Sequence, residues 1–362
     1  MEKLISSSLW ILKSLADVAE FGLKALIVVI SFALCVLIIK RIRPSEKSDK
    51  KKLKIENLKK QYEKYTHQFH QKTMEKKEFK NYLKESINQD SFWKNFFKKD
   101  NSKESAEEKK PTEKNKDSSL FVLSFEGDIM ASQVKNLREE ISIILNIAQP
   151  KDEVALLLES RGGSVSHYGL AANQLQRLRQ NKIPLTVCVD KMAGSGGYLM
   201  ACVGNEILAS PFAFVGSIGV LLGLPNIYEF LKKHNISYEE FTAGKYKRTV
   251  TPLGQITPEK REKLQEQLEL VHQQFKNFVQ KYRKIDLEEV ATGEAWLAET
   301  ALQKGLVDKL QCSDDYILEK IKTHNVYKIS LKQPQSLLEK LTNKKPLANQ
   351  ALEELLQKDC FY

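Results

Sequence analysis

Residues 184–200, PLTVCVDKMAGSGGYLM, join an apolar run of strand length to a glycine-rich turn. A run without a polar face, here PLTVCV (184–189), is typical of a strand buried on both faces of a parallel sheet. The turn encloses Ser195 between Gly194 and Gly196. A helix that begins near Gly196 would leave the serine hydroxyl exposed for chemistry, whereas a glycine-lined packing turn would give it no chemical role. The spacing does not match a GxSxG nucleophile elbow.

The same strand-length pattern occurs twice earlier in the chain, and helical periodicity fills the gaps. The apolar runs are LFVLSF (120–125) and VALLLE (154–159), and the amphipathic stretches are 131–148 and 167–180. The order is therefore strand, helix, strand, helix, strand. With strands that are apolar on both faces, this order predicts an α/β fold in which helices cover a parallel sheet.

The pattern continues beyond the quoted stretch. We expect more strand and turn within 206–220 and a long helix over 257–284. Thr257 and Pro258 provide the capping signal for that helix. The α/β domain is predicted to span 118–322.

Three glycine-rich segments follow successive apolar runs and suggest a site. They are SRGGSV (160–165), AGSGGY (193–198) and VGSIGV (215–220). Sites in open parallel sheets collect at the carboxyl ends of the strands. The N–H of Gly196 would stand at a helix N-terminus, where an oxyanion is favoured, and Gly162 or Gly163 could supply a second donor.

A nucleophilic serine needs a partner that accepts its proton. One candidate is His167, with Asp190 or Glu159 as the acid that would orient it. The other known base is a neutral lysine, and the segment TAGKYKRTVTPLG (242–254) contains Lys245 and Lys247. Most loop lysines are simply solvated, so the residues alone leave this choice open.

Composition excludes several classes of site. The 362 residues include 57 Lys and Arg against 46 Asp and Glu, a formal net charge of +11. The five cysteines form no CxxC pair and the six histidines no HExxH pair, so we expect no metal, no cofactor and no disulfide framework.

The basic excess lies beside a predicted membrane span. Residues 25–39 carry no charge, and with their neighbours they predict a transmembrane helix over 21–40. A signal-peptide core and a buried helix are the competing interpretations. Residues 40–60 contain ten Lys and Arg but three Asp and Glu, so the positive-inside rule places the following domain in the cytoplasm. Nucleic-acid binding is the weaker explanation of this charge run, and no nucleic-acid partner is expected.

The remaining segments are predicted from composition. Residues 1–20 form an N-terminal segment, 41–100 a basic helical spacer with interleaved aromatic residues, 101–117 a disordered linker and 323–362 a C-terminal tail.

The ordered motifs resemble a known family. A paired-glycine turn, SGGY, GSIGV and GKYKR, in this order, are similar to the signal peptide peptidase A family of serine–lysine peptidases, closest to its SohB-type membrane-anchored branch. The resemblance covers about 119–322. It implies a crotonase/ClpP-like core of ββα units that assembles into rings, attached here to the N-terminal transmembrane helix.

The resemblance also implies roles for single residues. Ser195 resembles the nucleophile, and Lys247, 52 residues later, resembles the general base, with Lys245 as its local rival. Ser217 of GSIG resembles the residue that orients the lysine. Gly162 or Gly163 together with Gly196 resembles the oxyanion hole.

Two positions depart from the family pattern. Arg161 stands where the family usually has proline, and Gly194 where it usually has alanine. Neither removes a reacting group, so activity is still expected.

The implied activity is that of a membrane-anchored serine endopeptidase. Its expected substrates are apolar peptides, such as signal-peptide or membrane-protein fragments, and its expected partners are the lipid bilayer and further copies of the chain. The expected location is a bacterial inner membrane, crossed once. Charge favours a cytoplasmic catalytic domain, with the periplasmic side as the alternative. A crotonase-class acyl-CoA enzyme and a non-catalytic membrane-anchored scaffold are the rival functions.

Overall fold

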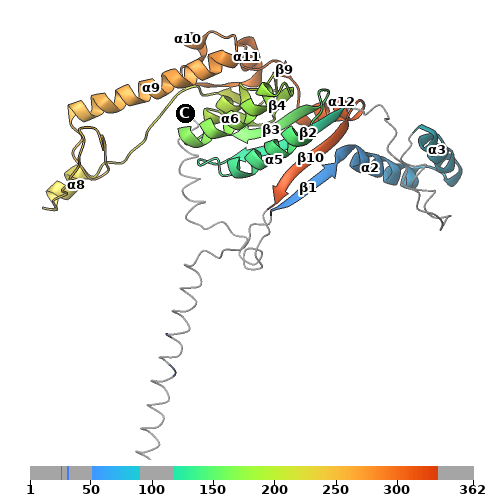
Figure 1. The fold of residues 1–362 in the computed structure, drawn as a ribbon, viewed down its shortest axis with the longest axis horizontal. Helices are drawn as coiled ribbons and strands as arrows, with labels where there is room; N and C mark the ends of the chain where they lie inside the picture. The colour runs from blue at the N-terminus through green and yellow to red at the C-terminus, as the bar shows by residue number, and fades with distance from the viewer. Residues whose placement is uncertain (1–25, 27–30, 32–50, 90–117, 333–362) are drawn as a thin grey trace, which may run out of the picture. The chain divides into compact units, whose positions relative to one another are not determined.

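The structure is a computed structural model that describes residues 26, 31, 51–89 and 118–332. The described residues between Leu53 and Lys332 belong to one compact unit. It is built on a ten-stranded sheet whose main path runs β1-β10-β2-β3-β4-β6-β9 (Figure 1). The strands on this path are β1 (Lys52–Asn57), β10 (Asn325–Lys332), β2 (Ser119–Gly127), β3 (Glu153–Ser160), β4 (Leu185–Val189), β6 (Glu206–Ala209) and β9 (Lys309–Leu310).

The predicted parallel sheet is confirmed. From β10 to β9, each neighbouring pair on the path is parallel. The three apolar runs of the sequence form β2, β3 and β4, and all five residues of β4 are buried. Because strands of this kind have no polar face, helices must cover the sheet on both sides.

Successive residues of β2 divide between the two sides of the sheet. Phe121, Leu123 and Phe125 belong to the large core cluster, and Leu120 and Val122 belong to the smaller one. This alternation follows from the two-residue period of a strand. Helices α5 (Val134–Ile147) and α6 (Val165–Gln180) cover the larger cluster, and α12 (Ser313–Ile321) contributes Tyr316 and Ile317 to the other.

The helices follow the predicted periodicity where they flank the sheet. The predicted helices at 131–148, 167–180 and 257–284 appear as α5, α6 and α9, and Thr257 caps α9 through a hydrogen bond from the Lys260 N–H. The bounds are α2 (Leu58–Thr73), α3 (Lys76–Gln89), α5 (Val134–Ile147), α6 (Val165–Gln180), α7 (Gly196–Ala201), α8 (Tyr228–Lys233), α9 (Pro258–Tyr282), α10 (Leu287–Val290), α11 (Ala298–Gln303) and α12 (Ser313–Ile321).

Three short strands form a branch off the sheet. They are β5 (Met192–Gly194), β7 (Phe214–Gly216) and β8 (Ala295–Leu297). Strand β5 pairs with β3 through Ser160 and Ala193, and also with β7, while β8 is antiparallel to β7. The three glycine-rich segments therefore begin at the ends of three neighbouring strands, β3, β5 and β7.

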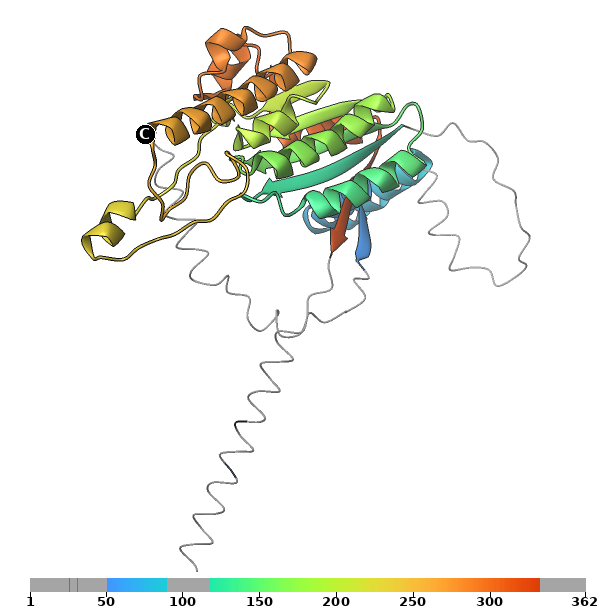
Figure 2. The same cartoon turned by 60° about the vertical axis from the view of Figure 1, so that its left-hand side comes forward.

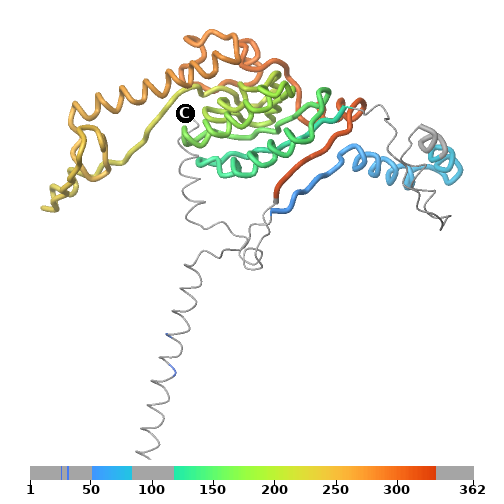
Figure 3. The backbone as a smooth tube through the Cα atoms, in the orientation of Figure 1, coloured from blue at the N-terminus to red at the C-terminus, as the bar shows by residue number. Residues whose placement is uncertain are grey.

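Both boundaries of the domain differ from the prediction. The tube in Figure 3 shows β10, in red, beside β2, so the sheet continues to Lys332 rather than ending near 322. In the predicted spacer, α2 and α3 are helical, but 52–57 is a strand beside β10. The alternating polar residues of KLKIEN suit an exposed edge strand.

A long segment after β7 lies apart from the sheet. We call residues 221–254, which include α8, the arm. Figures 1 and 2 show it at the end of α9 that is away from the sheet. Hydrogen bonds within the arm hold it together, for example from the Asn226 side chain to the carbonyls of Thr251 and Gly254.

Several predicted segments lie mostly outside the described residues. These are 1–20, the span 21–40, the linker 101–117 and the tail beyond 332. Within the part of the chain that is described, no helix combines the length and apolarity needed to cross a bilayer.

Candidate active site

Ser195 stands at the junction between β5 and α7. Its backbone has φ 50° and ψ −117°, a conformation that a residue with a Cβ rarely adopts. The Ser195 N–H donates to the carbonyl of Gly216 at 2.8 Å, and the Ser195 carbonyl accepts from the Leu199 N–H at 2.9 Å. The helix begins at Gly196, as expected, and the serine is half-buried. A strained serine between a strand and a helix is the arrangement that presents a nucleophile.

The paired-glycine turn lies directly against this serine. Gly162 has φ 94°, and a Cβ placed on it would lie 2.7 Å from both the Ser195 Cβ and the Gly196 nitrogen. Only glycine fits at such a distance. The turn after β3 and the turn after β5 therefore form one surface.

The backbone donors of these turns are not equivalent. The Gly162 N–H donates to the Ser160 Oγ at 3.0 Å and is occupied. The N–H groups of Gly163 and Gly196 have no acceptor among the described residues. Of the two paired glycines, Gly163 is therefore the one whose donor is available to a substrate oxygen.

Ser217 occupies the matching position on the neighbouring strand. Gly194 of β5 and Gly216 of β7 are in register, and Ser195 and Ser217 are the next residues of the two strands. Ser217 has φ 53°, and its N–H donates to the Glu294 carbonyl at 2.5 Å. A Cβ on Gly194 would lie 3.7 Å from the Ser217 Cβ. The structure thus brings the two serine turns together.

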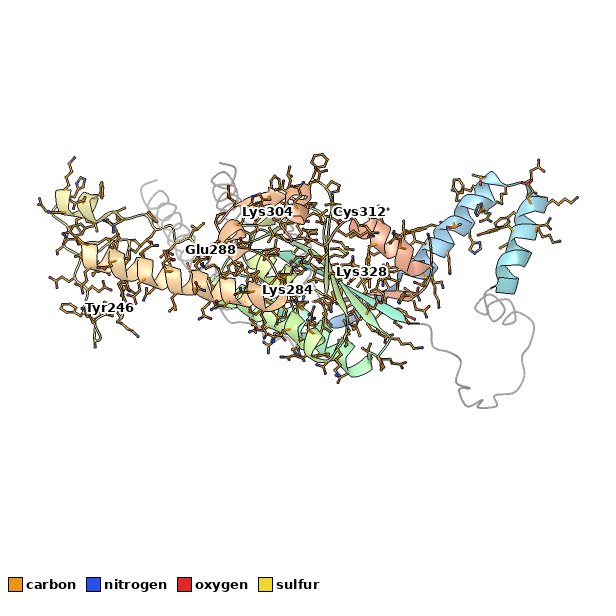
Figure 4. All side chains as sticks on the ribbon, turned by 90° about the horizontal axis from the view of Figure 1, so that it is seen from above. Tyr246, Lys284, Glu288, Lys304, Cys312 and Lys328 are labelled. Carbon is orange, nitrogen blue, oxygen red and sulfur yellow. The ribbon has the colours of Figure 1, made fainter. Side chains whose placement is uncertain are left out.

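Lys247 is not brought to these turns. It is exposed on the arm, where its N–H donates to the Gly244 carbonyl at 3.1 Å. The backbone N–H groups of Ser195 and Ser217 instead bond to the carbonyls of Gly216 and Glu294, and neither bond involves the arm. Its neighbour Tyr246 is labelled in Figure 4 at the end of the arm.

Lys245, the local rival of Lys247, is engaged elsewhere. Its ammonium lies 2.9 Å from the Glu259 carboxylate and 5.1 Å from the centre of the Tyr246 ring. The hydrogen bond to Glu259 raises the pKa of Lys245, which keeps it protonated. A base must give up its proton, so Lys245 is the poorer candidate.

The alternative triad is not assembled. His167 Nδ1 lies 2.9 Å from the Ser164 Oγ, in the first turn of α6. Glu159 pairs with Lys191 at 2.8 Å. Asp190 accepts from the Ser313 backbone N–H at 2.9 Å and so fixes the start of α12. Each member of this set has a local structural role instead.

The two departures from the family pattern lie beside the site. Arg161 is exposed, and its carbonyl oxygen would lie 3.4 Å from a Cβ on Gly194. Gly194 does not have a positive φ. Its backbone therefore does not require glycine.

Sequence reasoning did not single out Ser160 and Tyr168, which lie buried beneath the glycine turns. The one available signal was a polar Ser160 at the end of an apolar strand. Over the described ranges, no group of three His, Cys, Asp or Glu side chains could hold a metal ion.

The chain matches known peptidase sequences. The model described as Peptidase family S49 matches residues 177–327, and that described as Peptidase family S49 N-terminal matches 13–175. "Probable protease SohB" of Haemophilus influenzae is 49% identical over 63% of this chain and 65% of that protein. "Probable protease SohB" of Buchnera aphidicola from Acyrthosiphon pisum is 46% identical over 69% of this chain and 74% of that protein. The match to the Haemophilus protein thus covers less than two thirds of its length.

A solved structure of the membrane-bound stomatin-specific protease 1510-N, with a substrate peptide, is similar over 62% of this chain and 96% of that one. The sequence identity is 16% and the TM-score 0.37. A likeness of that size assigns no residue.

Proposed function

Because the chain belongs to peptidase family S49, we propose that it is a membrane-anchored serine endopeptidase with Ser195 as nucleophile and Lys247 as general base. The observation that carries this proposal is the position of Ser195. Ser195 stands on a strained strand–helix junction and against the paired-glycine turn, and the N–H groups of Gly163 and Gly196 have no acceptor among the described residues. Such donors stabilise the negative charge that develops when a serine attacks a carbonyl.

The proposed reaction proceeds through an acyl-enzyme. The neutral amine of Lys247 takes the Ser195 hydroxyl proton while Oγ bonds to the carbonyl carbon of the peptide. The resulting oxyanion accepts hydrogen bonds from Gly163 and Gly196. When it collapses, the C–N bond breaks and the lysine ammonium protonates the leaving amine. A water then loses a proton to the lysine, attacks the ester and releases the acid, and Ser195 regains its proton.

The side chain of Lys247 must become less exposed to solvent than it is in a single chain. A lysine accepts a proton only where burial or a nearby cation favours its neutral form. Lys247 is exposed, and so are large apolar side chains of the arm, among them Leu221 at 87% and Phe241 at 89%. Large apolar side chains that are exposed on one segment favour burial against a partner. We propose that a second copy of the chain covers the arm and completes the dyad.

The ring-forming crotonase/ClpP-like core implied by the resemblance belongs to the same proposal. One feature supports the core: strands β4 and β5 are followed by helix α7, which is a ββα order. The proposed substrates are apolar peptides released at the membrane.

The dyad is tested with a peptide substrate and a fluorophosphonate that captures reactive serines. We expect Ser195→Ala to lose labelling and to lower kcat/KM by about ten-thousandfold or more. Lys247→Ala should do nearly the same, while the matched control Lys245→Ala keeps its activity. A wild-type rate in either variant would contradict the assignment of that residue to the catalytic dyad. An acyl-CoA enzyme would not be labelled by the fluorophosphonate. A scaffold would keep its function in the Ser195→Ala variant.

The location is proposed to be the inner membrane, with the catalytic domain on the cytoplasmic side because of the basic flank at 40–60. A reporter fused to the C-terminus tests this. Activity of a reporter that folds only outside the cytoplasm would place the domain on the periplasmic side.

A further inference from the structure

A pair of hydroxyl groups is buried directly beneath the turns of the candidate site. Ser160 is 3% exposed and Tyr168 is fully buried. The Ser160 Oγ and the Tyr168 phenol oxygen are 2.6 Å apart. The phenol oxygen also lies 2.8 Å from the carbonyl of Asp128, to which it donates. Neither side chain has a part in the chemistry proposed above, although both lie directly under the glycine turns of the site.

Counting hydrogens fixes the direction of every bond in this chain. A phenol has one hydrogen, and that of Tyr168 goes to the Asp128 carbonyl. The Ser160 hydroxyl must then donate to the Tyr168 oxygen. Its remaining capacity accepts the Gly162 N–H at 3.0 Å. The bonds therefore run one way, from Gly162 through Ser160 and Tyr168 to Asp128.

This chain of bonds occupies one N–H of the paired-glycine turn and leaves the other without an acceptor among the described residues. With the Gly162 donor held by Ser160, the next peptide supplies the donor that has no acceptor among the described residues, that of Gly163. If the Gly162 peptide were released, the turn could rotate and the Gly163 donor would lose its fixed direction. Donors aimed in advance are what lowers a barrier of this kind.

The tyrosine also contacts the other turn. A Cβ on Gly196 would lie 2.4 Å from the Tyr168 Cγ, so the ring packs against the backbone of that residue. A Cβ on Gly127 would lie 2.3 Å from both hydroxyl oxygens, and one on Gly197 would lie 2.6 Å from the Ser160 carbonyl oxygen. Three glycines thus leave just enough room for the pair. Tyr168 thus contacts the Gly196 backbone with its ring, and its hydroxyl is bonded to the Ser160 hydroxyl that holds the Gly162 N–H.

We propose that Ser160 and Tyr168 are positioning residues that orient the Gly163 and Gly196 N–H groups toward the oxyanion. The inference rests on the proposed peptidase function and names the parts that aim its oxyanion donors. Burial raises the pKa of Tyr168, which keeps the phenol protonated at neutral and moderately alkaline pH. Tyr168 therefore holds a bond and transfers no proton in the cycle.

The test compares Ser160→Ala, Tyr168→Phe and the double variant, with the full chain and a peptide substrate. Ser160→Ala breaks the bond to Gly162 and should lower kcat at least about tenfold, with KM within about twofold. Tyr168→Phe keeps the ring and should have the smaller effect. Because both act through one chain of bonds, the double variant should be little worse than Ser160→Ala. Affinity for a peptide boronic acid, which forms a tetrahedral adduct on Ser195, should fall in parallel with kcat/KM.

Tyr316→Phe is the matched control. Tyr316 is also buried and donates to a side-chain hydroxyl, that of Thr186 at 3.1 Å, on the other face of the sheet. It should lose comparable stability and keep kcat. Three results would each overturn the inference. The first is a double variant whose loss of kcat equals the product of the two single losses. The others are a change confined to KM and a kcat equal to that of Tyr316→Phe.

The pH–rate profile gives a further readout. It should keep its midpoints in Tyr168→Phe, and a shifted midpoint would mean that Tyr168 transfers a proton and would also overturn the positioning role. Failure of the fluorophosphonate to label the wild-type chain would instead remove the proposed function itself.

Discussion

Two glycines beside Ser195 occupy different kinds of backbone position. Gly162 has φ 94°, and an added Cβ would meet Ser195 Cβ and backbone atoms at less than 3 Å. Gly194 has no such φ, and the nearest atom to its Cβ would be the Met192 Cε methyl at 3.1 Å. A backbone clash cannot relax, whereas the end of a methionine can move.

We therefore predict opposite outcomes for alanine at the two positions. Gly162→Ala should lower the free energy of unfolding by about 1–3 kcal/mol and remove most activity. Gly194→Ala should keep activity within about threefold and gain up to about 1 kcal/mol, because alanine restricts the unfolded chain. Urea titration and peptide hydrolysis check both. Similar losses in the two variants would contradict the assignment of space around them.

At the residue scale the sequence located part of the site. The glycine segments after apolar runs indicated Ser195 and Gly196, and the family resemblance indicated Ser217. The ends of the neighbouring strands β5 and β7 bring Ser195 and Ser217 together. It could not choose between Gly162 and Gly163, because that choice depends on a hydrogen bond to Ser160. Tyr168 could not be identified from the sequence because it occupies an ordinary core position in the helical apolar pattern of 167–180.

At the scale of elements, the central strands were predictable and the short or polar ones were not. LFVLSF, VALLLE and PLTVCV are apolar on both faces, which few structures other than buried parallel strands satisfy. Strands β5 and β7 have three residues each, too few for a period to be recognised. Strand β10 pairs with β2, which lies at the other end of the domain sequence, and no local sequence signal predicts such a long-range contact.

The sheet face under α12 makes stability sensitive to alkaline pH. Burial raises the pKa of the Cys188 thiol to about 12, and burial also raises the pKa of Tyr316. Below pH 9 the thiol is protonated in both the folded and unfolded chain. Above pH 9 the unfolded chain releases that proton while the folded chain retains it, so stability falls as pH rises.

We predict a decrease in the free energy of unfolding that begins near pH 9, where the thiol of the unfolded chain ionises, and continues toward about pH 12, the pKa of Cys188 in the folded chain. Each such group contributes up to about 1.4 kcal/mol per pH unit. Urea midpoints at several pH values measure it. Cys188→Ala should show a shallower decline, and equal slopes in the two proteins would refute the role of this thiol.

At the scale of the whole molecule, the arm is the segment that we propose a second copy covers. Leu221 and Phe241 are exposed on it, and because they make little core contact, changing them should not unfold the domain. We predict that Leu221→Asp with Phe241→Asp shifts the protein toward monomers in sedimentation and lowers activity, with an unchanged circular dichroism spectrum.

The matched control is Leu318→Asp on α12, a position that is 45% exposed and away from the arm. It should leave both assembly and activity unchanged. A double arm variant that still assembles, or one that is monomeric and fully active, would disprove the role of the arm.

The same assembly can be tested by complementation. Ser195→Ala and Lys247→Ala are each expected to be inactive alone. If the lysine of one copy serves the serine of another, a mixture of the two should recover part of the wild-type rate. No recovery, under conditions where the mixed species form, would mean that each arm closes on its own chain.

Lys247 is exposed on the arm, and if a second copy must cover it, as we propose, proteolysis would depend on the concentration of the protein. Specific activity should collapse on dilution and return after a lag when the protein is concentrated again. A membrane would favour assembly by confining copies to two dimensions. A chain that detached, or that had just been synthesised and remained alone, would be harmless to its neighbours, with no inhibitor or propeptide needed to restrain it.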